Sequence, residues 1–260
     1  FSRIQGSAQP FGTEAPHSLA LVGSTWIWLD HTRRLATMQG RQVVNVASPY
    51  DRLIQSYSTV DNAIGYAVSI EGIPLYILTF PSAGETFVYN YLSQQQPWSK
   101  WGNWQSSTGS YDRYRGQAYC FARDWGKHLI GDHSNGKIYT ASRRFFTDNN
   151  STIRSLLRTD PISHGIYTDK ISDIVRLHCK RGLGAITPPN PQIMMRRRVN
   201  NRPAFNAERW RSLGRVGDHF SYIDWKANGV YRTCQYEFVH SDATDLVIMG
   251  AQEYLTALNW

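Results

Sequence analysis

Cysteine is scarce in this chain of 260 residues, and the few present cannot build a metal or disulfide framework. Cys120, Cys179 and Cys234 lie far apart in the sequence, with no CxxC pair and no Cys/His spacing of the kind that binds zinc. An odd, sparse set of thiols is typical of proteins that fold in a reducing compartment. We therefore expect the cysteines to act as small core hydrophobes, and we expect no metal and no cofactor.

Long apolar runs are missing as well. Residues 19–22 and 26–29 are among the apolar runs, and they are far shorter than the roughly 20 residues that a membrane-spanning helix needs. No signal-peptide pattern is visible, so we expect no contact with a membrane. The chain begins with Phe1 rather than Met, which leads us to expect that it is part of a longer protein with a further N-terminal portion.

The familiar catalytic motifs are also absent. The sequence contains no GxxxxGK[ST] loop, no HExxH and no GxSxG. Asp124 and Asp132 are the remaining candidates for an acid–base pair of the glycosidase kind. Asp132, however, lies in an expected hairpin turn, where aspartate is favoured for backbone reasons alone. We expect a protein that is not an enzyme, and a glycoside hydrolase with a dispersed site is the disfavoured alternative.

Aromatic residues, in contrast, are abundant. They make up 13% of the chain, with 9 Trp and 15 Tyr, whereas long helical stretches rich in Ala, Leu, Glu and Lys are missing. Aromatic and β-branched side chains suit the half-buried surface of a pleated sheet. The composition therefore predicts an all-β protein.

A repeat organises the first part of the chain. Three clusters of turn-forming residues each lie between two strand-like runs, and the runs that follow begin at Leu35, Thr86 and Lys137, a spacing of 51 residues. Hairpins at this spacing are typical of β-propeller blades, which stack and bury each other's apolar faces. The clusters occupy residues 30–34, 81–85 and 132–136, and the glycines that open the units are Gly23, Gly72 and Gly126.

Three tryptophans, Trp98, Trp101 and Trp104, follow the second unit. We expect them to pack between neighbouring blades. The alternative is that they stack on a sugar or a base, in which case the chain would be a glycan-binding β-propeller such as a receptor-binding tail module.

The pattern changes near residue 165. We predict β-propeller-like blades over residues 1–165 and a basic C-terminal antiparallel β domain over residues 166–260. Three blades are fewer than the 4–8 of a typical propeller, so this second domain either stands alone or helps to complete the ring. Within it, the pair Asn228-Gly229 predicts a hairpin turn.

The positive charge of the chain is concentrated in this second part. The net charge is +8, yet residues 176–232 hold 12 Lys or Arg against 3 Asp or Glu, while the rest of the chain has a net charge of −1. Such a field suits either a polyanion or a protein interface. The candidates for such a polyanion contact or interface are Arg196, Arg197, Arg198, Arg202, Arg209 and Arg211.

Several short pieces follow one another along most of the chain: residues 12–19, 23–29, 75–81, 86–89, Trp98, residues 131–132, 136–139 and 212–217, Trp225 and Gly229. In this order they resemble the tail hub family of short-tailed (podovirus) bacteriophages, also called packaged-DNA stabilisation proteins. One departure is clear, because residues 196–202 are strongly basic where the family has an Asp/Gly-rich turn.

The resemblance implies a structural role in the virion tail. Family members form a homo-oligomeric ring, expected to be a hexamer, below the portal and adaptor rings. Such a hub or nozzle extends the DNA conduit, helps to retain the packaged genome and anchors the tail plug or needle. Assembly in the host cytoplasm and non-specific contact with packaged DNA are further expectations, and the six arginines named above are then the candidates for a DNA-conduit or interface role.

Overall fold

The computed structural model describes residues 11–40, 42–182, 189–218 and 222–258, and the chain divides into two compact units. The first unit is Phe1–Phe145 and the second is Phe146–Trp260. This division comes earlier than the one at residue 165 that the sequence suggested. The reason is that strand β15 (Ser155–Arg158) pairs with strand β20 (Cys234–His240) of the second unit.

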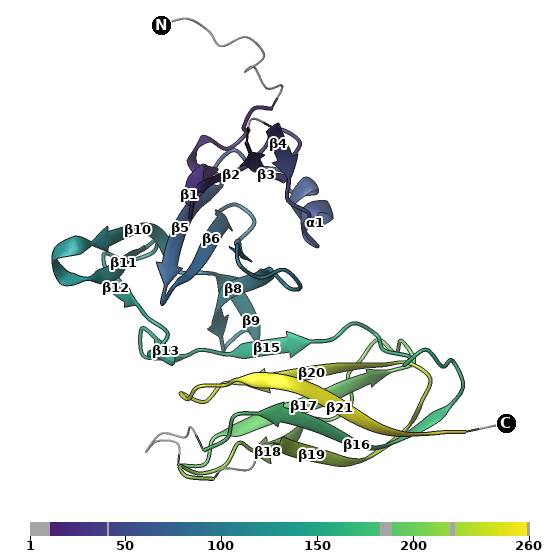
Figure 1. The fold of residues 1–260 in the computed structure, drawn as a ribbon. Helices are drawn as coiled ribbons and strands as arrows, with labels where there is room; N and C mark the ends of the chain where they lie inside the picture. Colours follow the sequence, from purple (N-terminus) through teal and green to yellow (C-terminus); the bar gives the residue numbers. More distant parts are fainter. Residues whose placement is uncertain (1–10, 41, 183–188, 219–221, 259–260) are drawn as a thin grey trace, which may run out of the picture. The chain divides into compact units, whose positions relative to one another are not determined.

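The described residues of the first unit form three antiparallel sheets, each built by strands that follow one another in the chain, and the predicted all-β, blade-type architecture is confirmed (Figure 1). Blade 1 comprises β1 (Ala20–Val22), β2 (Thr25–Leu29), β3 (Leu35–Gln39) and β4 (Gln42–Asn45). Blade 2 comprises β5 (Ile64–Ile70), β6 (Ile73–Phe80), β7 (Glu85–Asn90), β8 (Trp98–Gln105) and β9 (Ser110–Arg113). Blade 3 comprises β10 (Gly116–Ala122), β11 (Lys127–Asp132) and β12 (Ile138–Ala141).

Short helical turns connect these strands. The 3-10 turn η1 (Pro16–Ser18) precedes blade 1, the helix α1 (Asp51–Gln55) lies between blades 1 and 2, and the 3-10 turn η2 (Arg123–Trp125) joins β10 to β11. The glycines at the first hairpin of each blade have φ angles of 62°, 82° and 60°, a region that only glycine enters without strain. These glycines are the predicted Gly23, Gly72 and Gly126.

The repeated turn has the same side-chain geometry in blades 1 and 3. Oδ1 of Asp30 accepts hydrogen bonds from the backbone N (2.8 Å) and the hydroxyl (2.7 Å) of Thr32. Oδ1 of Asp132 accepts the same two bonds from Ser134, each at 2.8 Å. Pro81 occupies the corresponding position of blade 2. The turn geometry that blades 1 and 3 share, 102 residues or two units apart, explains why the repeat could be detected in the sequence.

Two apolar clusters fill the spaces between the blades. Alternate residues of β6 point to opposite faces, so Tyr76 and Leu78 join a cluster shared with blade 1, whereas Ile77 joins a cluster on the other face of blade 2. Trp98 packs against the first cluster, and Trp101 packs against the second, together with Tyr119 of blade 3. The predicted packing between blades is therefore confirmed for these two tryptophans, whereas Trp104 contacts Tyr111 of β9 within blade 2, with ring centres 4.9 Å apart.

The second unit is a pair of antiparallel sheets that share one core. One sheet has the strand order β15-β20-β17-β18 and the other has the order β19-β16-β21, while β13 and β14 form a separate hairpin. Buried residues of both sheets, among them Leu177, Trp225 and Phe238, form the cluster between them. The remaining bounds are β13 (Thr147–Asp148), β14 (Ser151–Thr152), β16 (Lys170–Cys179), β17 (Gln192–Val199), β18 (Arg209–Ser212), β19 (Tyr222–Tyr231) and β21 (Ile248–Ala257).

Two local expectations are wrong. Cys179 and Cys234 are buried in the core of the second unit, but Cys120 is exposed, because it lies on β10 where residues alternate between packed and solvent-facing positions. Asn228-Gly229 is not a hairpin turn: β19 continues through it to Tyr231 with a register shift against β16. The left-handed conformation of Ala227 and Gly229 forms a bulge within the strand.

Candidate interface: the arginines of the second unit

Three consecutive arginines of β17 are divided between the two faces of their sheet. Side chains alternate along a strand, so Arg197 lies on the face of the buried Met195 and Val199, whereas Arg196 and Arg198 lie on the other face. In the antiparallel pairing with β20, Arg196 stands opposite Glu237. The arrangement explains how a strand can carry three adjacent cations.

Glu237 is the centre of a charge row that crosses three strands. Arg196 of β17 donates from Nε to Oε1 of Glu237 at 2.5 Å, and Arg158 of β15 donates from Nε to Oε2 at 2.8 Å. The carboxylate has no exposed surface. Burial alone would raise the pKa of Glu237, but hydrogen bonds from the two guanidinium groups bring it below its usual value. The side chain of Arg196 therefore stabilises the pairing of β17 with β20.

Phe205 lies beside this row and contacts three guanidinium groups. The guanidinium carbons of Arg158, Arg196 and Arg198 are 5.2, 4.9 and 5.5 Å from the centre of its ring. Cations within about 6 Å of an aromatic face are stabilised by the ring. The aromatic residue and the carboxylate together offset the repulsion among the three cations.

Arg197 and Arg209 are held on the inner side of the second unit. Nη1 of Arg197 is buried and has no hydrogen-bond partner within the described part of the chain. Arg209 donates to Oδ1 of Asn228 at 2.6 Å and to the carbonyl oxygen of Lys226 at 2.5 Å. Burial, followed by the charges of Arg211 and Arg197, lowers the pKa of Arg209.

Arg202 and Arg211 are exposed. Arg211 donates from Nε to the carbonyl oxygen of Asp224 at 3.3 Å, and from Nη1 to the carbonyl oxygen of Trp210 at 2.9 Å. The candidate arginines therefore do not form one patch: Arg196 and Arg198 lie together, Arg197 lies on the opposite face, and Arg202 is outside the charge row.

Part of the positive charge of residues 176–232 is neutralised within the unit. Arg176 makes a two-pronged ion pair with Asp224, with Nε and Nη2 each 2.8 Å from the carboxylate. Its guanidinium lies 3.9 Å from the ring centre of Tyr222. Arg181 pairs with Asp218 at 3.1 Å and Arg232 with Asp169 at 2.9 Å. Together with Arg196, which pairs with Glu237, these make four of the twelve basic side chains of the segment that have a carboxylate partner among the described residues.

The candidate acid–base pair in blade 3 is not assembled. Asp124 lies in η2, just before β11, and Asp132 ends that strand. At about 3.3 Å per residue, the strand separates the two carboxylates by more than the 5–9.5 Å typical of glycosidases. Asp132 is further held by Arg115 and Tyr139. Burial opposes ionisation of Asp132, but bonds from Ser134, Tyr139 and Arg115 lower its pKa, so it serves as a structural anion.

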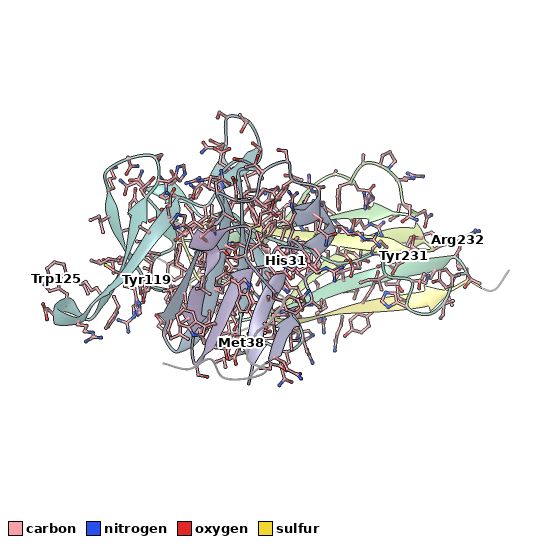
Figure 2. All side chains as sticks on the ribbon, turned by 90° about the horizontal axis from the view of Figure 1, so that it is seen from above. His31, Met38, Tyr119, Trp125, Tyr231 and Arg232 are labelled. Carbon is pink, nitrogen blue, oxygen red and sulfur yellow. The ribbon has the colours of Figure 1, made fainter. Side chains whose placement is uncertain are left out.

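Exposed apolar surfaces at the two end blades are features that the sequence reading missed. A depression of about 580 Å³ on blade 1 is lined by Leu19, Trp26 and Met38, among others, and Leu19 and Trp26 are 50% and 47% exposed. At blade 3, Trp125 and Ile138 are 69% and 70% exposed, and Figure 2 shows Trp125 projecting from the end of its hairpin. The alternation of exposed and buried residues along the strand could have revealed the surface on blade 1. Leu19 and Leu21 are exposed, whereas Ala20 and Val22 pack on the core.

No cluster of three or more potential metal ligands occurs within the described ranges. None of the helices in the part of the chain that the structure covers is long and apolar enough to cross a membrane.

Comparison with known proteins identifies one family. The family described as "Bacteriophage P22 Gp10, beta-propeller" matches residues 1–144, which include all three blades. No match was found among curated proteins. A solved carbohydrate-binding module of the β-sandwich superfamily is 9% identical and covers 76% of this chain and 97% of its own. Its TM-score of 0.18 is too low to carry any argument about this protein.

Proposed function

Because the chain belongs to the bacteriophage P22 Gp10 β-propeller family of phage tail structural proteins, we propose that it is a subunit of the tail hub or nozzle. In this role it extends the DNA conduit below the portal and adaptor, helps to retain the packaged genome and anchors the tail plug or needle. It is assembled in the host cytoplasm and works without catalysis or cofactor. The observation that carries the proposal is the family match over the stacked blades.

The stacked blades suit a conduit wall. Blade 2 buries both of its faces, with Tyr76 and Phe87 packed toward blade 1 and Val68 and Ile77 packed on its other side. Well-packed interiors are stiff and transmit force without rearranging. A wall of this kind keeps its shape when DNA passes.

The exposed apolar surfaces of the end blades support a multi-subunit assembly. Apolar patches that remain exposed on a folded chain commonly mark protein contacts. We propose that the surface around Trp26 on blade 1 and the surface around Trp125 on blade 3 are covered by other parts of a homo-oligomeric ring, a hexamer, or by the portal, adaptor and plug proteins.

The candidate arginines of the second unit fall into two groups, one that stabilises the unit and one that is available to contact another molecule. Arg196 and Arg209 are bound to internal acceptors, so we assign them to the stability of the second unit. Arg198 stacks on Phe205, and Arg202 is exposed, so these two are assigned to a weak, sequence-independent contact with DNA phosphates or with an acidic neighbour.

Two of the three tryptophans that motivated the glycan-binding alternative are committed to packing between the blades. Trp98 and Trp101 pack against the two interblade clusters, and Nε1 of Trp98 donates to the carbonyl oxygen of Ala47 at 2.9 Å. The packing of the blades thus accounts for the presence of Trp98 and Trp101.

Electron microscopy and analytical ultracentrifugation of the purified protein, alone and mixed with portal and adaptor rings of the same phage, test the proposal. We expect rings or binding to the portal–adaptor assembly. A monomer that joins neither a ring of its own nor the portal–adaptor assembly would contradict the hub assignment.

A further inference from the structure

A crevice with a volume of about 240 Å³ lies between blades 1 and 2 and shares only Met38 with the lining of the depression on blade 1. Its walls come from β2, β3 and β4 of blade 1 and from β7, with the residue that follows it, of blade 2. The polar side chains of the walls are Thr25, Thr37, Gln39, Asn45, Tyr89 and Tyr91.

The chemistry of these walls is unusual for so basic a protein. Hydroxyl and amide groups supply both donors and acceptors, and among the described lining residues none carries a charge. Among these described residues an anion would find no cation to neutralise it, and a metal ion would find no carboxylate or imidazole. Tyrosine adds a ring with an apolar face and a polar tip. Such a lining matches a neutral molecule with several hydroxyl groups.

Thr37 provides a specific reason to expect an occupant. The residue is buried, and its Oγ1 has no hydrogen-bond partner within the described residues. On the sheet it stands between the apolar residues Ile27 and Val44, where valine would have the same shape without the cost of an unsatisfied hydroxyl. Buried polar groups in folded proteins nearly always have a partner.

A second polar group lies at the wall formed by blade 2. The hydroxyl of Tyr91 is 3.3 Å from Oγ1 of Thr25, so one hydrogen bond joins the two blades there. Each hydroxyl retains capacity for a further bond. Tyr91 is 39% exposed, and its ring is therefore accessible from solvent.

The size of the crevice limits what can enter. Its volume corresponds to about eight water molecules at roughly 30 Å³ each and is smaller than typical pockets for drug-sized ligands. We propose that the crevice binds a single ring of a neutral saccharide, with Thr37 and Tyr91 bonding its hydroxyl groups and the tyrosine rings contacting its apolar face.

The test uses the full chain and a panel of glucose, galactose, mannose and N-acetylglucosamine, with saturation-transfer NMR and calorimetry as readouts. At least one sugar should bind in the millimolar range. Because no charged group takes part, affinity should not change between about 50 and 200 mM salt.

Two variants and one control separate binding from folding. Thr37→Val keeps the shape of the residue, so it should leave the melting temperature equal or higher while weakening binding about fivefold or more. Tyr91→Ala should weaken binding at least as much. Tyr254→Ala removes a similarly exposed tyrosine (44%) of the second unit and should leave the affinity unchanged.

Three outcomes would overturn the proposal. The first is that no sugar of the panel gives a signal, and the second is that binding is unaffected by Thr37→Val and Tyr91→Ala. The third is that adenosine or thymidine binds in the crevice and the sugars do not, since the site would then recognise a base.

Discussion

The hydroxyl of Tyr76 donates a 2.6 Å hydrogen bond to the carbonyl oxygen of Ser18, and both residues are fully buried. The bond joins β6 of blade 2 to the turn that precedes blade 1. Gly65 makes this approach possible, because a Cβ atom at that position would lie 2.4 Å from the same oxygen and 2.5 Å from the tyrosine hydroxyl. Blade 2 thus contacts the backbone that precedes blade 1 at two groups, the hydroxyl of Tyr76 and the Cα of Gly65.

Replacement of this glycine should therefore separate the blades. We expect Gly65→Ala to destabilise the protein by about 3 kcal/mol, since the obstructing atom is backbone and cannot turn aside. Thermal or urea unfolding measures the change. Gly131→Ala is the matched control, because its added Cβ would meet only the Cβ of Ala118, at an ordinary 3.6 Å. Equal stability of the two variants would contradict the close contact.

Removal of the Tyr76 hydroxyl should destabilise the protein less than Gly65→Ala does. Tyr76→Phe removes the donor and leaves the buried carbonyl oxygen of Ser18 without this bond, at an expected cost of about 1–2 kcal/mol. The ring keeps its place in the interblade cluster. Urea denaturation followed by circular dichroism would measure the loss, and an unchanged midpoint would show that the bond is not formed in solution.

The charge row of the second unit predicts a dependence on pH. The pKa of Glu237 is lower in the folded protein than its ordinary value of 4.5, so its contribution is complete above that pH and is lost as the pH falls through the folded pKa. At neutral pH, Glu237→Gln should cost about 2 kcal/mol. Melting temperatures measured at falling pH should show a shallower decline for the variant, and parallel curves would argue against the row.

The two kinds of arginine should respond differently to substitution. We expect Arg196→Ala to lower the melting temperature, since it leaves the buried Glu237 with Arg158 alone. The double variant Arg198→Ala/Arg202→Ala should keep the melting temperature within a few degrees but weaken binding to a duplex of random sequence.

Fluorescence anisotropy at two salt concentrations checks this DNA contact. Binding by the unaltered chain should fall steeply between about 50 and 200 mM salt, as expected for phosphate contacts that release counterions. Salt-insensitive or absent binding would favour an acidic protein neighbour instead.

The sequence was sufficient to predict the blades because their turns are local. The bonds of Asp30 and Asp132 reach only two residues along the chain, so the same residue types reappear at the same spacing. Gly65 and Gly116 are also 51 residues apart, and both stand where an added Cβ would clash, a further regularity that the sequence reading did not use.

Other features depend on contacts that the sequence order hides. Arg196 and Glu237 are 41 residues apart, and Glu237 lies outside the basic segment, so a charge count over residues 176–232 could not anticipate their pairing. Asn228-Gly229 has the composition of a hairpin turn, yet Asn228 is buried and holds Arg209, which keeps it inside β19. In both cases tertiary contacts override the local pattern.

Cryo-electron microscopy of the phage particle that carries this protein would test the account most directly. We predict a ring of copies in the tail, below the portal and adaptor, into which the three blades of residues 20–141 fit as stacked sheets with the surfaces around Trp26 and Trp125 covered. Particles that lack the chain, or a position outside the tail, would contradict the account.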